Sequence, residues 1–195
     1  MTNRKKGLII TSLGVLFVVP DSLFVRLIDS EPMIIAFWRG TIAGSLILTA
    51  LLISNGISAF KPIFNSGFPG VLYIILIGST TPAFVFAVTY TSVANVVFIF
   101  ASIPIFALFF SYIFLGEAIQ LPTVLTSIVV FLGLAIIAYG SGSSEISSWK
   151  GDLLAVYVSA AYAAALTALR KLKEISMVPA IPIAYIGTAL IISLF

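Results

Sequence analysis

The stretch Val96–Leu115, VVFIFASIPIFALFFSYIFL, decides the fold, because it is uncharged and apolar on every face. A helix needs about 20 apolar residues to cross the roughly 30 Å hydrocarbon core of a bilayer. Only helices and closed barrels satisfy their backbone hydrogen bonds in lipid. Barrel strands alternate apolar and polar residues, whereas this stretch and 124–139 do not. The chain is therefore expected to be an all-α membrane protein.

The whole composition agrees with a chain that lies mostly in lipid. Hydrophobic residues make up 61% of the sequence and charged residues 9%, and the mean hydropathy is +1.21. A soluble domain of this length would not carry so much apolar surface. We expect a polytopic helical bundle of about seven transmembrane helices. The expected spans are 7–28, 33–53, 68–90, 92–115, 121–140, 152–169 and 178–195.

Two missing residue types exclude most enzyme chemistry. The chain has no Cys and no His, which excludes disulfides, thiolate nucleophiles, histidine metal ligands and every triad with an imidazole base. Asp21 is the one carboxylate expected deep in a span, so a paired-acid site cannot be assembled either. We therefore predict no enzyme, no catalytic residue, no metal and no cofactor.

The basic residues predict the orientation. The formal net charge is +3, and Lys and Arg collect in cytoplasmic loops of membrane proteins. A cytoplasmic N-terminus puts most of them inside, so the charge requires no nucleic-acid partner. We expect a multi-pass protein of the cell membrane. The inside set is Arg4, Lys5, Lys6, Lys61, Arg170, Lys171 and Lys173.

A weak internal repeat divides the chain. Placing Gly7 on Gly151, a shift of 144 residues, aligns Arg26 with Arg170 without a gap across two spans. Five spans separate the copies, and an odd number reverses the second copy in the membrane, as in many transporters. We expect a first five-helix repeat at 1–140, a linker at 141–150 and two helices of an inverted second repeat at 151–195.

Five short motifs lie in or beside the second to fifth expected spans: Ala36–Gly40, Tyr90–Asn95, Ser102–Pro104, Leu115–Glu117 and Gly133–Gly140. These motifs resemble the EamA-type domain of the drug/metabolite transporter superfamily. The resemblance implies two inverted five-helix repeats around a central cavity, with amino acids and other small metabolites as solutes. The second repeat here would lack three helices.

The leading functional hypothesis is a secondary carrier of small organic solutes that works by alternating access. With half a cavity, the chain alone is expected not to transport unless a partner chain or a homodimer completes the bundle. The alternative is a seven-helix receptor-like or structural membrane protein without transport. A retinal protein is disfavoured because 178–195 contains no Lys.

Asp21 and Arg39 are the charged candidates for a solute site. A carboxylate in lipid costs at least about 2.5 kcal/mol, so Asp21 must face protein or water. It either binds a proton or cation, or caps a helix that breaks at Pro20. Arg39 either contacts solute or forms a structural ion pair, with Asp21, Asp29 or Glu31 as its partner.

Two proline sites are expected to bend helices near the middle of the membrane. Pro82, beside Thr81, and Pro104, beside Ser102, each remove a backbone hydrogen bond. The freed carbonyls and hydroxyls either border a solute site or satisfy one another.

The remaining candidates lie near span ends. Tyr90 and Asn95 flank the short turn after the third span, as solute contacts or as interface residues. Glu117 is expected to make a structural or gating contact with a basic inner loop. Gly40 and Gly44 form a GxxxG pattern, which predicts close helix packing.

Overall fold

The computed structural model describes residues 3–18, 20–140, 148–173 and 175–195, so most of the predicted linker lies outside the described residues. All regular secondary structure in these ranges is helical, which confirms the all-α fold class for this part of the chain. The elements are α1 (Asn3–Val18), α2 (Asp21–Leu27), α3 (Pro32–Asn55), η1 (Ile57–Phe60), α4 (Lys61–Phe64), α5 (Gly67–Tyr90), α6 (Val93–Phe100), α7 (Ile103–Leu115), α8 (Leu121–Gly140), α9 (Trp149–Lys171) and α10 (Ala180–Ile192).

Among the residues that the structure describes, four helical segments are long and apolar enough to cross a membrane. They are α3, α5, α9 and the run Val93–Leu115, which comprises α6 and α7. Leu121–Gly133 and Ala180–Ile192 are apolar but shorter. The prediction of helices able to span a membrane is thus confirmed, whereas the predicted number of about seven is not.

The predicted first span is two helices rather than one. α1 ends at Val18, and α2 begins at Asp21 with Pro20 as its N-cap residue. Proline has no N–H to donate and clashes with a preceding helical turn, so it fits the start of a helix better than its interior. The break places Asp21 in the first turn of a short helix.

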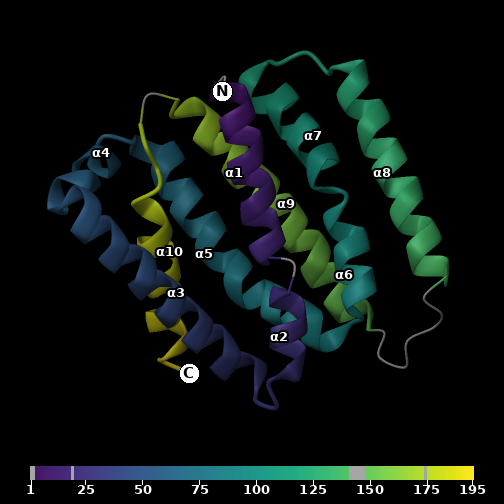
Figure 1. Ribbon diagram of the computed structural model, residues 1–195, viewed down its shortest axis with the longest axis horizontal. Coiled ribbons are helices and arrows are strands. Elements are labelled where there is room, and N and C mark those ends of the chain that lie inside the picture. The colour runs from purple at the N-terminus through teal and green to yellow at the C-terminus, as the bar shows by residue number, and fades with distance from the viewer. Residues whose placement is uncertain (1–2, 19, 141–147, 174) are drawn as a thin grey trace.

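α5 and α9 form the centre of the bundle and pack along each other (Figure 1). α10 and α3 lie on one side of this pair, and α6 and α7 lie on the other side against α9. α8 lies at the edge, next to α6 and α7. Helices 149–171 and 180–192, distant from α3 and α5 in sequence, therefore complete the packing around them.

The two ends of the bundle are named here by one residue each. The Thr91 end contains the turn from α5 to α6, the start of α9 and the start of α3. The Glu117 end contains the end of α7, the end of α9 and the beginning of α1 (Figure 1). A core of buried residues lies toward each end, including Val85 and Val88 in one and Tyr73 and Met177 in the other.

α3 and α10 approach closely at two glycines. A Cβ on Gly40 would lie 3.0 Å from the backbone oxygen of Tyr185, and a Cβ on Gly44 would lie 2.7 Å from Cγ1 of Ile186. Small residues let helix backbones approach in a membrane. The helix contact predicted from the GxxxG pattern is confirmed.

Large apolar side chains point away from the bundle on several helices. Leu46, Ile75, Val129, Leu132 and Leu190 are each more than half exposed. A soluble protein rarely leaves such a surface uncovered. A bilayer accommodates it.

Candidate functional site

Arg39 and Asp21 form an ion pair between α3 and α2. Arg39 Nη2 lies 2.6 Å from Asp21 Oδ2, and Arg39 Nε donates to Oδ1 at 3.4 Å. Each side chain keeps 30% of its surface exposed. Asp21 is the first residue of α2 and not its N-cap residue, which is Pro20. Its carboxylate is therefore a partner for Arg39, as the ion-pair hypothesis expected, and not a helix cap.

Phe84 lies beside Arg39, and tyrosines from three helices extend from the pair toward the other end of the bundle. The guanidinium carbon of Arg39 lies 4.9 Å from the ring centroid of Phe84 on α5. Tyr185 on α10 is within electrostatic reach of Arg39, Asp21 and Tyr162, and Tyr73 on α5 is within reach of Tyr162 and Tyr185. We call these six residues the Arg39 cluster.

The Arg39 cluster contains two charged side chains that remain partly exposed. An unpaired charge at the bilayer centre costs at least about 2.5 kcal/mol on insertion scales, so membrane proteins pair such charges or place them in water-filled cavities. Arg39 and Asp21 pair with each other, and their partial exposure is compatible with a water-filled cavity. A ring face beside a guanidinium adds a cation–π attraction of about 0.5–2 kcal/mol. An anionic group that replaces Asp21 on Arg39 would keep the guanidinium paired.

A second polar assembly, the Thr91 network, joins α2, α5, α6 and α9 at the Thr91 end. Arg26 donates from Nη2 to the Thr91 carbonyl at 2.6 Å and from Nε to the Val88 carbonyl at 3.3 Å. These carbonyls end α5 and have no partner within that helix. Thr91 Oγ1 donates to Asp152 Oδ1 at 2.8 Å and accepts from Asn95 Nδ2 at 3.3 Å. The network therefore ties the start of α9 to the turn between α5 and α6.

Gly151 makes this junction possible. A Cβ at this position would lie 2.8 Å from both the backbone nitrogen and the Cβ of Thr91, and 2.9 Å from the carbonyl carbon of Tyr90. Because two of these atoms belong to backbone, no side-chain rotation relieves the contact. A residue without a side chain is required where α9 meets the turn.

At the opposite end, Arg170 joins α9 to the end of α7. Gly116 adopts the left-handed conformation with φ 65°, which terminates α7. The next residue is Glu117, and Arg170 Nη1 donates to its Oε2 at 2.8 Å and to Ser111 Oγ at 3.0 Å. The two charged side chains are about half exposed, at 51% for Arg170 and 44% for Glu117. Glu117 thus contacts a basic residue at the end of α9.

Side-chain hydroxyls near Pro82 donate hydrogen bonds to backbone carbonyls of the same helix. Ser79 Oγ donates to the Leu76 carbonyl at 2.8 Å, and Thr80 Oγ1 donates to the Ile77 carbonyl at 2.7 Å. Thr81 is buried, and α5 continues through Pro82. This arrangement favours the interpretation in which the hydroxyls satisfy the helix itself.

At the break between α6 and α7, side-chain hydroxyls likewise donate hydrogen bonds to a backbone carbonyl. The Ile99 carbonyl accepts from Ser102 Oγ at 2.6 Å and from Ser159 Oγ on α9 at 3.3 Å. Pro104 occupies the first turn of α7, where its missing N–H costs nothing. Ser102 is therefore bonded to backbone at the break, and α9 supplies the second donor.

The structure brings together only some of the predicted site residues. Asp21 and Arg39 meet, and Asn95 lies in the Thr91 network. Tyr90 is exposed at the same end, with its ring 5.7 Å from that of Phe86. Thr81 and Ser102 have no described contact with the Arg39 cluster.

Sequence reasoning missed several members of these sites. Tyr73, Tyr162, Tyr185 and Asp152 look like ordinary interface or cap residues until the helices are packed. The alignment of Arg26 with Arg170 was a usable signal, because both arginines make contacts at the end of another helix. Within the described ranges, no group of three potential metal-binding side chains comes together.

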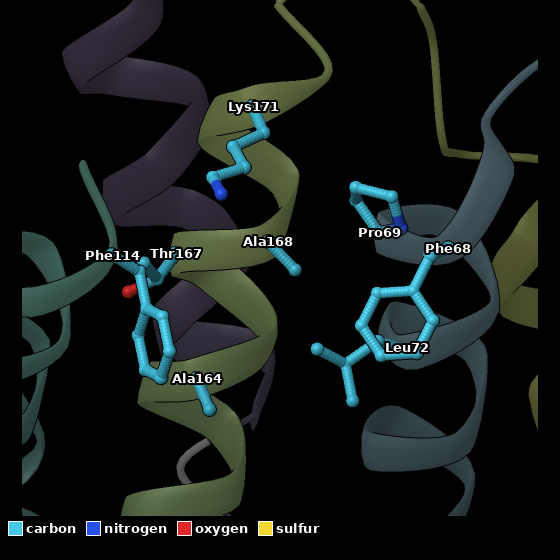
Figure 2. Close-up of a pocket in the computed structure, with 8 residues that line it drawn as sticks. All are labelled: Phe68, Pro69, Leu72, Phe114, Ala164, Thr167, Ala168 and Lys171. Atoms are coloured by element: carbon cyan, nitrogen blue, oxygen red, sulfur yellow. The ribbon is translucent and has the colours of Figure 1, made fainter.

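A cavity of about 130 Å³ lies between α5, α7 and α9, and no residue of the Arg39 cluster lines it. Figure 2 shows Phe68 and Leu72 on one side, Phe114 on the other, and Ala164 and Ala168 on α9 between them. Its wall is almost wholly apolar.

The comparisons agree with the helical, apolar architecture. The model of the EamA-like transporter family matches residues 5–139, while the comparisons with curated proteins and with solved structures give no match. The match covers more than half of the chain and includes the whole segment from α2 to α7. EamA proteins are membrane transporters of the drug/metabolite transporter superfamily rather than enzymes. The chain, with its spanning helices and its charged pair between α2 and α3, belongs to the EamA-like transporter family.

Proposed function

We propose that the protein is a secondary carrier of small organic metabolites, amino acids and related solutes among them, and that the solute binds at the Arg39 cluster. The observation that carries the proposal is the Arg39–Asp21 ion pair, at 2.6 Å with each side chain 30% exposed. Its partial exposure leaves the pair accessible to a solute, and a partly exposed pair is easier to separate than a fully buried one.

The chemistry of the pair suggests how a solute is held. A guanidinium binds a carboxylate through two parallel hydrogen bonds, so a solute carboxylate competes directly with Asp21 for Arg39. Displaced Asp21 is then available for a solute ammonium group or for a proton. The tyrosines of the cluster offer hydroxyls and ring faces to the rest of the solute.

We propose alternating access as the mechanism, with the two ends of α9 as the gates. The Thr91 network holds one end of α9 and the Arg170–Glu117 pair holds the other. Exposed ion pairs contribute about 0–1 kcal/mol, so the Glu117 end can open at small cost. Breaking one gate while the other holds would expose the Arg39 cluster to one side at a time.

The charge distribution supports an orientation with the N-terminus in the cytoplasm of a cell-membrane protein. Lys61, Arg170, Lys171 and Lys173 all lie near the Glu117 end, where α1 also begins. Positive residues favour the cytoplasmic side. The Glu117 end would then be cytoplasmic and the Thr91 end external.

We further propose the division into a repeat at 1–140 and a second, inverted copy from 151. α10 packs against α3, its counterpart under the 144-residue shift, in support of this division. α1 packs sparsely, and Leu8, Ile10 and Leu16 are more than half exposed. We propose that a second copy or a partner chain covers this face and completes the cavity.

Uptake by reconstituted liposomes tests the proposal. The full chain is inserted at a series of protein-to-lipid ratios, and a labelled panel of amino acids and other small metabolites is supplied outside. We expect saturable uptake of at least one carboxylate solute, with uptake per chain rising with density as copies associate. Arg39→Gln should lower uptake at least tenfold, and Lys150→Gln, an exposed charge outside the cluster, is the matched control. Absence of uptake at every density would favour a structural or receptor-like role.

A further inference from the structure

The cavity between α5, α7 and α9 opens toward the Glu117 end and belongs to neither the Arg39 cluster nor the Thr91 network. Its volume is about 130 Å³. Figure 2 shows the alanines of α9 facing the space between Phe114 and Leu72. Two small side chains on α9 thus leave a groove between two helices that carry large ones.

Apart from Lys171 at its end, the wall of the groove is apolar. The one wall hydroxyl, Thr167 Oγ1, is already engaged, because it donates to the Ala163 carbonyl at 2.9 Å. Apolar cavities of about 150 Å³ stay free of water and take up apolar ligands. A segment of an alkyl chain fits this space.

One positively charged side chain, that of Lys171, lies at the end of the groove. Lys171 lines it from the last turn of α9 (Figure 2). Glu117, a nearby carboxylate, is already paired with Arg170. Lys173 is exposed two residues further on. The groove therefore offers an apolar slot with positive charge at its mouth.

A hydrogen bond crosses the α5–α9 interface further along the same faces. Tyr157 OH donates to Ser79 Oγ at 2.7 Å. Tyr157 precedes Ala164 by seven residues and Ser79 follows Leu72 by seven, so these residues share helix faces two turns, about 10 Å, from the cavity. The bond limits the groove toward the middle of the membrane, which sets a finite length for its occupant.

We propose that this groove is a binding site for one anionic phospholipid of the leaflet at the Glu117 end. One acyl chain lies between Phe68 and Phe114, over the α9 alanines, and the phosphate pairs with the Lys171 ammonium. Basic pockets between transmembrane helices bind anionic head groups in this way. The positive charge of Lys171 at the opening of the groove favours an anionic over a zwitterionic lipid. The apolar wall favours an acyl chain over a polar solute. The proposal does not depend on transport activity.

Native mass spectrometry of the purified full chain tests it with two lipids of equal chain length, phosphatidylglycerol and phosphatidylcholine. We expect one retained phosphatidylglycerol with a clear preference over phosphatidylcholine. Lys171→Gln should reduce that preference about fivefold, the effect of one cation near an anionic head group. Lys173→Gln, which removes the same charge outside the groove, should change it less than twofold.

Filling the groove gives an independent test of the chain site. Ala164→Phe should lower retention of both lipids, while Val156→Phe, the same kind of enlargement on an exposed position of α9, should not. Helical content by circular dichroism shows that each variant is folded. Equal retention of the two lipids by the wild type would overturn the proposal. So would an Ala164→Phe variant that retains lipid normally but loses an oligomer, because the groove would then be a helix contact between copies.

Discussion

Arg26 and Arg170 occupy equivalent positions under the 144-residue shift, and each bonds to the end of another helix at opposite ends of the bundle. Arg26 reaches the Thr91 carbonyl at 2.6 Å, and Arg170 reaches Glu117 Oε2 at 2.8 Å. The first contact fixes the end of α5 and the second fixes the end of α7. This relation is what an inverted repeat would produce, and it connects the repeat hypothesis to the two proposed gates.

Reversing the charge of Glu117 should change the uptake rate while leaving the free energy of unfolding almost unchanged. Because the pair is about half exposed, Glu117→Arg should change the free energy of unfolding by no more than about 1 kcal/mol. It should nonetheless alter the uptake rate severalfold by opening that gate. Adding Arg170→Glu to the same variant should restore the rate. Thermal unfolding and liposome uptake give the two readouts, and a double variant as impaired as the single one would rule out the direct pairing as the gate.

Gly151→Ala should be strongly destabilising, because its Cβ would lie 2.8 Å from backbone and side-chain atoms of Thr91. Overpacking of this kind costs about 1–3 kcal/mol. Gly187→Ala on α10 is the control, since nothing lies within 4 Å of a Cβ there, and alanine should be neutral or better in that helix. Thermal midpoints of both variants in one detergent decide the comparison; equal midpoints would contradict the close approach of α9 to the turn.

Removing the Thr91 hydroxyl should weaken the junction at the Thr91 end. Thr91→Val leaves Asp152 and Asn95 without their shared partner, and loss of a hydrogen bond to a charged group costs about 1–3 kcal/mol. Thr91→Ser keeps the hydroxyl and should retain most of the stability. Protease sensitivity near the start of α9 reports the junction directly. Identical cleavage of the two variants would show that the network does not hold α9.

Asp21→Asn should uncouple transport from a proton gradient in the assembled carrier. An amide cannot take up or release a proton in place of the carboxylate, so uptake driven by an imposed pH gradient should be lost. Exchange of labelled for unlabelled solute across the same membrane should persist, because it needs binding without net proton movement. Unchanged pH dependence of uptake in Asp21→Asn would remove this residue from coupling.

Much of the architecture could be predicted from hydropathy, because a bilayer leaves few alternatives to helices. Local chemistry indicated the break near Pro104 and offered the break at Pro20 as one alternative, but α5 continues through Pro82, where a bend was expected too. The composition of the Arg39 cluster could not be predicted. Its tyrosines come from three helices, and their proximity depends on how α9 and α10 pack against α5.

The charged candidate residues show the same limit, since the sequence does not predict which side chains meet when the helices pack. Asp21, Asp29 and Glu31 were equal partners for Arg39 in sequence, and the helix break at Pro20 decided among them. Tyr90 and Asn95 are neighbours in one motif, yet only Asn95 joins the Thr91 network. A motif identified the turn but not which of its side chains makes contact across it.

The most direct test of the proposed solute site is uptake by the charge-swapped variant Asp21→Arg with Arg39→Asp. The swap keeps an ion pair between α2 and α3, so a thermal midpoint near that of the wild type is expected. A solute carboxylate would then face a rearranged site, and uptake should fall at least tenfold while Lys150→Gln remains active. Full uptake by the swapped variant would contradict solute binding at Arg39, because it would show that the pair serves only to hold the two helices together.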